Sequence, residues 1–299
     1  MKLQQLRQFV ALAETLNFHR AAEQLHMAQP PLSVSFRKLE DELGTALILR
    51  GARGLSLTPA GEAALIAARQ TLVHADRVHR VVRETIAGGR GELRLGFVGS
   101  AVYHLLPSLL RAFRAEFSQI EITLQESRTA ELLKAIDAGS IDAAIVRTPL
   151  LQETAAVVSP LVRDHLDLAV AHESPFARRK RVHLGELRDQ PFVVYGRDSV
   201  PSMYAITMLA CQQAGFVPRV VQEAGQSQTI ICLVESQLGV ALVPRVIGRR
   251  NSAVAFLALR GRAGQVPTGL AIAIGASQPP VTAVRFRDFA VRFATEYDI

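Results

Sequence analysis

The sequence predicts an α/β protein in three parts: a small helical domain ending in a strand pair, one long helix, and a larger domain of alternating strands and helices. Three observations predict this division. Helical apolar spacing and a glycine-flanked turn occupy residues 1–58, neither glycine nor proline interrupts 62–87, and strand and helix patterns alternate from Glu92 onward. With 299 residues, the chain has room for two or three hydrophobic cores. We expect boundaries at residues 1–58, 59–90 and 91–299.

Composition excludes several classes of protein. Hydrophobic residues make up 49% of the chain and charged residues 20%, which is typical of a globular protein and not of a disordered one. No apolar run approaches the ~18 residues of a membrane span. Glu14, Arg20 and Glu23 interrupt the region where a signal peptide would be apolar. Cys211 and Cys232 lack metal-site spacing, so we expect reduced thiols, no metal, no cofactor and a cytoplasmic location.

Three short helices are predicted within the first 43 residues. Apolar residues recur at helical spacing along the first: Leu3, Leu6, Phe9, Val10 and Ala13. Asn17 is the expected N-cap of a second helix, over 18–26. The third begins at the pair Pro30-Pro31 and ends before Gly44. Its inward face is expected to carry Leu32, Phe36, Leu39 and Leu43.

The second and third helices resemble a helix-turn-helix, which places a helix N-terminus in the major groove of DNA. Polar residues on the outer face of the third helix are Ser33, Arg37 and Lys38. The segment 47–58 is predicted to be a strand, a turn and a strand, forming a wing from which Arg50 and Arg53 reach phosphates or the minor groove. The net charge of +7 is compatible with a nucleic-acid partner. The alternative is a helical packing module whose polar face only meets solvent.

Residues 59–87 are predicted to form one helix roughly 45 Å long, capped by Thr58 and ended by the glycines after Ala87. Apolar and small residues form a heptad seam along it: Leu65, Ala68, Leu72, Ala75, His79, Val82 and Ile86. A stripe of this kind needs a packing partner. We therefore predict a homodimer through the seam; the alternative is that the seam packs on the chain's own C-terminal domain.

The C-terminal part alternates between strand and helix patterns. Strands are predicted at 93–98, 120–124, 141–146, 167–171, 191–195, 217–222, 239–243 and 269–274. Helices are predicted at 104–117, 129–139, 201–214, 229–237 and 281–297. Such alternation implies a mainly parallel sheet covered by helices.

Small polar residues follow the predicted strands and head the next helices. The expected ligand-site residues are Gly99, Ser100, Arg128, Thr129, Val200, Pro201, Ser202, Gln226 and Ser227, with Arg147 after the third strand. Helix N-termini carry free N–H groups and partial positive charge, and ligands of open α/β sheets bind at the carboxyl ends of the strands. The pattern predicts a small anionic effector.

Motifs for catalysis are missing from the sequence. The segment Gly225-Gln226-Ser227-Gln228-Thr229 lacks the final glycine of a nucleophile elbow, and neither GxxxxGK[ST] nor HExxH occurs. An enzyme built on the C-terminal half is the weaker alternative. A solute-binding protein of a transport system is excluded more firmly. Nothing directs export of the chain, and its N-terminus matches a DNA-binding pattern.

The N-terminal sequence resembles the LysR-type transcriptional regulators. The residues that carry the resemblance are Leu6, Phe9, Ala21, Ala22, Leu25, Gln29, Pro30, Leu32, Ser33, Leu39, Glu40, Leu43, Gly44, Leu47, Arg50, Gly54, Leu57, Thr58, Ala60 and Gly61, and farther on the segment 239–244. The resemblance implies that Gln29, Pro30 and Ser33 face the bases and that Arg53 enters the minor groove. The neighbouring residues Pro31, Arg37, Lys38 and Arg50 are also expected to contact DNA. Ala28, Phe36 and Ile48 depart from the usual serine, isoleucine and phenylalanine, and Ala28 lacks a hydroxyl for a phosphate.

The resemblance also implies two subdomains like those of periplasmic binding proteins, subdomain I at 91–162 with 268–299 and subdomain II at 163–267. The stretch from Phe97 to Ser100, with Thr129 and Pro201, is similar to members that sense muconate and other acids of aromatic catabolism. It further implies an activator, double-stranded DNA with a partly palindromic site, a homotetramer, and contact with RNA polymerase.

Overall fold

The computed structural model describes residues 1–51, 54–86, 91–248, 252–261 and 266–296. The described side chains exclude those at 50, 51, 76, 77 and 79–86. The chain divides into two compact units, residues 1–88 and 89–299. The long helix therefore belongs with the N-terminal unit and is not a separate part between two domains.

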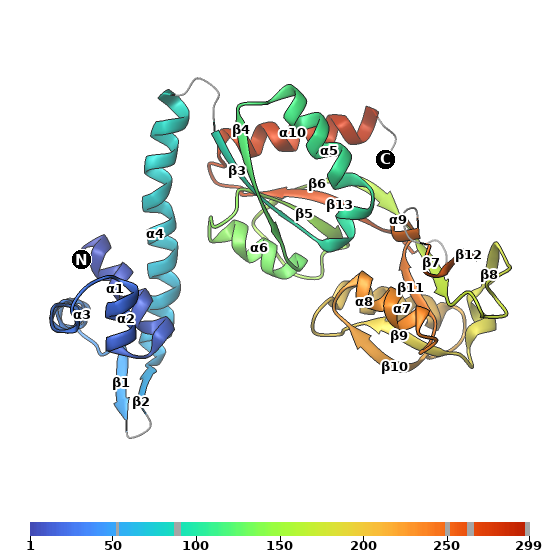
Figure 1. The fold of residues 1–299 in the computed structure, drawn as a ribbon, viewed down its shortest axis with the longest axis horizontal. Helices are drawn as coiled ribbons and strands as arrows, with labels where there is room; N and C mark the ends of the chain where they lie inside the picture. The colour runs from blue at the N-terminus through green and yellow to red at the C-terminus, as the bar shows by residue number, and fades with distance from the viewer. Residues whose placement is uncertain (52–53, 87–90, 249–251, 262–265, 297–299) are drawn as a thin grey trace. The chain divides into compact units, whose positions relative to one another are not determined.

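The N-terminal unit contains the three predicted helices: α1 (Leu3–Thr15), α2 (Phe18–Gln24) and α3 (Gln29–Leu43) (Figure 1). As predicted, Asn17 caps α2, because its side-chain oxygen accepts hydrogen bonds from the backbone N–H groups of His19 and Arg20 at 2.9 and 3.1 Å. Gly44, with φ of 70°, ends α3 in the left-handed region. The inward placement of Leu43 is wrong, since its side chain is 44% exposed in the last turn before the chain turns away.

The predicted wing is present as an antiparallel pair, β1 (Ile48–Gly51) and β2 (Gly54–Leu57). Its base is held by Thr58, whose hydroxyl donates to the carbonyl of Ala46 and accepts from the N–H of Gly61, both at 2.8 Å. A Cβ at Gly61 would lie 2.1 Å from the carbonyl oxygen of Leu47, so only glycine fits there. Arg53, which follows β1 in the sequence, lies outside the described residues, as does the side chain of Arg50.

The linker helix, α4 (Pro59–Ile86), corrects the expectation about the heptad seam. Ala68 is 3% exposed within the chain, and Leu65 and Leu72 pack with it on the core of the N-terminal unit, against α1. Arg69 on α4 also forms an ion pair with Glu14 on α1 at 2.8 Å. The first half of the seam is therefore covered by its own unit. This packing partner differs from both of the expected ones, a second copy of the chain and the chain's own C-terminal domain.

The rest of the seam is only partly described. Ala75 is half-buried, and the side chains of His79, Val82 and Ile86 lie outside the described residues. Ile66 and Val78 on α4 are 63% and 62% exposed. Among the described side chains of α4, the exposed apolar ones thus lie outside the predicted stripe.

The C-terminal unit begins with subdomain I, a five-stranded sheet in the order β4-β3-β5-β13-β6. Its strands are β3 (Gly91–Phe97), β4 (Ile120–Glu126), β5 (Ala143–Thr148), β6 (Val157–Asp164) and β13 (Thr268–Ile274). The short helix η1 (Gly99–Tyr103) follows β3. Helices α5 (Leu105–Glu116) and α10 (Val281–Glu296) cover one face, and α6 (Thr129–Asp137) covers the other (Figure 1). The core formed between sheet and helices aligns the carboxyl ends of β3, β4 and β5.

Subdomain II contains two smaller sheets. One has the order β11-β7-β12-β8, and the other pairs β10 with β9. Their strands are β7 (Leu166–Val170), β8 (Arg181–His183), β9 (Pro191–Tyr195), β10 (Arg219–Ala224), β11 (Ala241–Pro244) and β12 (Ala255–Arg260). The helices are η2 (Leu184–Leu187), α7 (Pro201–Gln213), α8 (Ser227–Glu235) and α9 (Arg245–Gly248). A parallel bridge between Phe192 and Val240 joins the two sheets.

The chain crosses between the subdomains twice. It leaves subdomain I where β6 ends at Asp164 and β7 begins at Leu166, and it returns between β12 and β13. Residues 163 and 164 therefore belong to the first sheet, two positions past the predicted boundary. Strand β13 is antiparallel to both of its neighbours, and β7 to β11 and β12, so the sheets are less parallel than expected.

Candidate functional site

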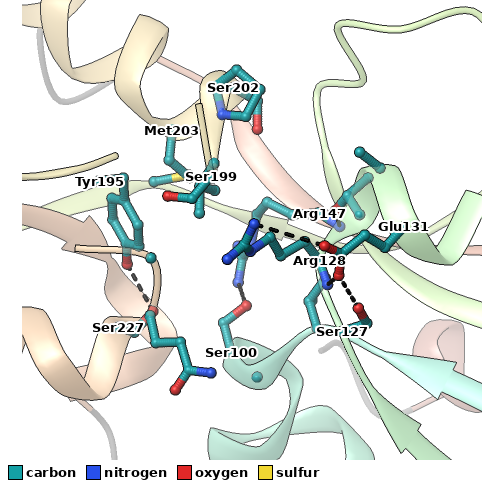
Figure 2. Close-up of a pocket in the computed structure, with 18 of the residues that line it drawn as sticks. Ser100, Ser127, Arg128, Glu131, Arg147, Tyr195, Ser199, Ser202, Met203 and Ser227 are labelled. Atoms are coloured by element: carbon teal, nitrogen blue, oxygen red, sulfur yellow. Dashed lines mark hydrogen bonds and ion pairs between the residues drawn. The ribbon is translucent and has the colours of Figure 1, made fainter. Parts of the chain in front are cut away.

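A cavity of about 470 Å³ opens at the carboxyl ends of the strands and is lined by both subdomains. All ten residues expected at the effector site line it: Gly99, Ser100, Arg128, Thr129, Arg147, Val200, Pro201, Ser202, Gln226 and Ser227. Figure 2 shows Tyr195 and Ser227 on one side and Ser127, Arg128 and Glu131 on the other. The cavity is large enough for a small organic molecule.

Three α-helices begin at the cavity wall, and none is capped by the side chain of its own N-cap residue. The N-cap residues are Arg128 for α6, Val200 for α7 and Gln226 for α8, and all three line the cavity. The first-turn N–H groups of a helix lack partners within it and carry its positive partial charge. Helix starts of this kind provide a favourable electrostatic environment for an anion.

Arg147 provides a full positive charge in the floor of the cavity. It lies near the end of β5, and its side chain is 4% exposed. Its guanidinium lies 2.6 Å from the hydroxyl oxygen of Ser100 and 3.5 Å from a carboxylate oxygen of Asp164. Burial lowers the pKa of Arg147 from its ordinary value, and the nearby carboxylate of Asp164 opposes this shift.

Hydrogen bonds from Arg147 also leave two hydroxyl groups free to donate their protons into the cavity. Ser100 accepts a hydrogen bond from the guanidinium, and Thr129 accepts one from the backbone N–H of Arg147 at 3.1 Å. Each hydroxyl has one proton, which these contacts do not use. Both protons are therefore available to a hydrogen-bond acceptor in the cavity, as a carboxylate oxygen would be.

The subdomain II wall is polar but uncharged. The hydroxyl groups of Tyr195 and Ser227 lie 2.8 Å apart (Figure 2). Burial raises the pKa of Tyr195 to about 12, so the phenol is neutral at physiological pH. The hydroxyl of Tyr103 on subdomain I donates to Gln228 on subdomain II at 2.8 Å and links the two subdomains beside the cavity.

Sequence reasoning missed several lining residues, including Glu126, Ser127, Glu131, Tyr195 and Met203. Glu126 and Tyr195 are the last residues of β4 and β9. The rule that ligands bind at the carboxyl ends of parallel strands would have identified both. Met203 and Glu131 lie inside helices, where the sequence carries no comparable signal.

Two carboxylates thus join two arginines at the cavity. Glu131 accepts a short hydrogen bond from Ser127 and lies 3.7 Å from the guanidinium of Arg128. The hydrogen bond from Ser127 is the main reason why the pKa of Glu131 is below its ordinary value. Arg128 and Glu131 are both about half exposed, so their pairing contributes little to stability.

The second candidate surface is the N-terminal half of α3. Gln29, Pro30 and Pro31 in its first turn are exposed, as are Arg37 and Lys38, whereas Ser33 is half-buried. The N-cap residue Ala28 forms no capping hydrogen bond with its side chain, so the N–H groups at the helix start are not covered by it. Gln8 of α1 holds α3 in place by accepting a hydrogen bond from Ser35 at 2.5 Å. An exposed helix start followed by basic side chains suits the major groove of DNA.

The described residues contain no cluster of three or more His, Cys, Asp or Glu side chains arranged for a metal ion. A helix long and apolar enough to cross a membrane is likewise missing from the described part of the chain.

Comparison with known proteins identifies the family of both parts of the chain. The family described as "Bacterial regulatory helix-turn-helix protein, lysR family" matches residues 3–62, and "LysR substrate binding domain" matches residues 87–294. The chain is 36% identical to the HTH-type transcriptional regulator AlsR of Bacillus subtilis over 244 residues, which are 82% of this chain and 80% of AlsR. It is 32% identical over 247 residues to the probable cat1 operon transcriptional activator of Acinetobacter lwoffii, covering 82% and 80% of the two chains.

A solved structure extends the likeness to the whole chain. Full-length CbnR in complex with its target DNA is similar with a TM-score of 0.80 and 26% identity, covering 98% of this chain and 100% of that chain. The proteins of this family are transcription regulators and not enzymes. The chain therefore belongs to the LysR family and is a DNA-binding transcriptional regulator with a C-terminal effector-binding domain.

Proposed function

We propose that this regulator responds to a small carboxylate bound in the cavity between subdomains I and II. The carrying observation is the set of groups around Arg147: its buried guanidinium, and the hydroxyl protons of Ser100 and Thr129 that it leaves available. These groups, with the starts of α6, α7 and α8, favour a compact anionic group at this point over a neutral or cationic one.

The first acids to test are muconate-like and aromatic carboxylates. The likeness of the stretch from Phe97 to Ser100, with Thr129 and Pro201, to muconate-sensing regulators supports this choice. The relative from Acinetobacter lwoffii is named a probable transcriptional activator, which supports an activator over a repressor. An activator of this kind would contact RNA polymerase. The protein would act in the cytoplasm, where promoters and catabolic acids occur together.

The DNA contacts would come from α3 and the wing. The residues that would face the bases are Gln29, Pro30, Pro31 and Ser33. Arg37 and Lys38 would contact phosphates. Arg50 and Arg53 of the wing would reach phosphates or the adjacent minor groove. The exposed first turn of α3 supports this assignment. Phosphate contacts release counterions, so affinity should fall steeply with salt concentration.

The working form would be a homodimer through α4 that assembles into a homotetramer. The exposed apolar side chains of Ile66 and Val78 support α4 as the dimer contact, whereas Ala68 is already covered within its own unit. A two-fold protein binds two half-sites, so the DNA site would be partly palindromic. The carboxylate would shift the population between arrangements of the subdomains that differ at the crossing from β6 to β7, at residues 164–166.

Selection of duplexes from a random library by the full-length protein tests the DNA part. We expect the enriched sequences to contain two half-sites related by a dyad. Arg37→Ala should weaken binding to the selected duplex about fivefold to tenfold in fluorescence anisotropy at fixed salt. Arg188→Ala, an exposed arginine of subdomain II, is the matched control. Enrichment of no sequence, or equal losses for both variants, would contradict the assignment.

Thermal denaturation with a panel of carboxylates tests the effector part. A ligand at one hundred times its Kd stabilises the native state by about 2.7 kcal/mol, which is a clear rise in Tm. The panel should include muconate, benzoate and chlorinated benzoates. We expect a saturable rise for one class of acid, together with a change in affinity for the selected duplex. A flat response to every carboxylate, with DNA binding intact, would remove the carboxylate and leave the regulator.

A further inference from the structure

Glu126 is the charged residue of the cavity that has no hydrogen bond and no ion pair among the described residues. It is the last residue of β4, and its exposed side chain lines the cavity. A Cβ at Gly99 would lie 2.5 Å from its carboxylate oxygen, so the carboxylate rests directly over the start of η1. Glu126 therefore presents a free negative charge to whatever occupies the cavity.

The other charges of the cavity are paired. Arg147 lies against Asp164, and Arg128 lies against Glu131. Each pair sums to zero once Asp164, which lies outside the cavity lining, is counted with Arg147, so the carboxylate of Glu126 is left without a positive partner among the described residues. A ligand with one carboxylate brings a second negative charge, and a dicarboxylate brings a third. Like charges at these separations repel unless the ligand also carries a positive group.

Strand order separates the two ends of the cavity. Strands β4 and β5 flank β3 on opposite sides, so Glu126 and Arg147 lie on strands two positions apart. Neighbouring strands are about 4.8 Å apart, which gives roughly 10 Å between the two backbones. A ligand can therefore place its carboxylate at Ser100 and Arg147 and a second group, a few atoms away, at Glu126.

We propose that the effector is a dipolar molecule, with a carboxylate bound at Ser100, Thr129 and Arg147 and a protonated amine bound at Glu126. The inference rests on the carboxylate proposal above and adds the charge that the ligand carries at its other end. Glu126 then determines specificity: it favours amino acids and other amine-bearing acids and disfavours dicarboxylates such as muconate.

Sets of acids that differ only in the second group test this inference. Suitable sets are 6-aminohexanoate, hexanoate and adipate; 4-aminobutanoate, butanoate and succinate; leucine and 4-methylpentanoate; and phenylalanine and 3-phenylpropionate. Kd values for the full-length protein come from thermal denaturation and calorimetry. We expect the amine-bearing member of at least one set to bind about tenfold or more tightly than its amine-free partner, and the dicarboxylate to bind weakest.

Glu126→Gln is the decisive variant, because it keeps the shape of the side chain and removes the charge. It should reduce the preference for the amine to about threefold or less and should tighten binding of the dicarboxylate. Glu121→Gln is the matched control, since Glu121 is an exposed carboxylate at the opposite end of the same strand and outside the cavity. It should leave both affinities unchanged.

The outcomes separate the two proposals. If amine-free acids or dicarboxylates bind as tightly as the amine-bearing members, the dipolar effector is wrong and the carboxylate proposal stands. An amine preference that survives in Glu126→Gln would overturn the role of Glu126. Failure of every acid in the sets and in the earlier panel to raise the Tm would overturn both proposals.

Discussion

The two walls of the cavity differ in how they are made polar. The four charged lining residues, Glu126, Arg128, Glu131 and Arg147, all come from subdomain I. Subdomain II contributes hydroxyl, amide and apolar side chains, with Tyr195 and Ser227 bonded to each other. In the binding mode proposed above, the wall of subdomain I would select a ligand by charge, and the wall of subdomain II by shape and neutral hydrogen bonds.

The difference has a structural cost on the charged side only. Arg147 is buried, and its guanidinium needs Asp164 and Ser100 as partners. The hydroxyl pair of subdomain II carries no net charge and needs only one hydrogen bond to be satisfied. We therefore expect changes in the subdomain I wall to affect stability and ligand binding more strongly than comparable changes in subdomain II.

The largest effect is expected for Arg147→Met. Removing the guanidinium leaves the carboxylate of Asp164, 3% exposed, buried without its cation, which destabilises a protein by about 3–5 kcal/mol. Urea denaturation measures the loss. The double variant Arg147→Met with Asp164→Asn should recover most of it, because no unpaired charge remains. Arg163→Met, at an exposed position of the same strand as Asp164, is the control and should change stability by less than about 0.5 kcal/mol.

A smaller effect separates two serines on opposite walls. Ser100→Ala should weaken binding of the acid that stabilises the wild type most by about tenfold, since it removes a hydroxyl that Arg147 directs toward the ligand. Ser227→Ala should cost about threefold or less, because the hydroxyl of Ser227 already bonds to Tyr195. Calorimetric titration measures both. Equal losses would mean that the two walls bind the anion alike.

The neutral wall is tested by pH. Tyr195→Phe should lower stability at pH 7 by about 1 kcal/mol through loss of the bond to Ser227. A tyrosine in the unfolded chain titrates near pH 10, whereas burial raises the pKa of Tyr195 in the folded protein to about 12. The unfolded state loses its proton first, so the stability that the neutral phenol confers declines as the pH rises from about 10 to 12.

Urea denaturation at several pH values should therefore show the gap between wild type and Tyr195→Phe closing above pH 10. Tyr204→Phe, in the same core, controls for removal of a phenol hydroxyl elsewhere. A gap that stays constant up to pH 12 would mean that Tyr195 is not held neutral by burial.

The smallest effect is expected for Glu131→Gln. The residue is 54% exposed, and its partner Arg128 is 55% exposed, so water screens the pair. The free energy of unfolding should change by less than about 0.5 kcal/mol in urea denaturation at pH 7. A loss of several kcal/mol would show that the exposed pair of Arg128 and Glu131 contributes as much to the free energy of unfolding as the buried pair of Arg147 and Asp164.

Helix ends were predictable where a single residue sets the end through one dominant local effect. Asn17 and Gly44 set the ends of helices through a cap and a left-handed residue, and both effects act over a single turn. Strand β6 was not predicted, because Pro160 and Arg163 interrupt its apolar pattern. In the structure Pro160 sits where the register with β13 shifts, at the edge of the sheet, where a missing N–H is tolerated.

The linker helix shows where periodicity fails. The seven-residue repeat predicted a stripe and, correctly, one unbroken helix, but a repeat cannot identify what covers it. The core of the N-terminal unit takes Leu65, Ala68 and Leu72, because α1 packs along the first part of α4. Partner choice depends on contacts between residues distant in the chain.

The sequence alone determined the helix-turn-helix, the wing, the unbroken linker helix and the small polar residues that head the helices of the C-terminal unit. These follow from capping, turn chemistry and periodicity, which depend on neighbours within a few positions. Only the tertiary structure decided that Arg147 meets Asp164 and Ser100, that Glu126 stands unpaired over Gly99, and that the charges gather on one wall. Those relations depend on strand order, which joins residues far apart in the chain and leaves no local trace in the sequence.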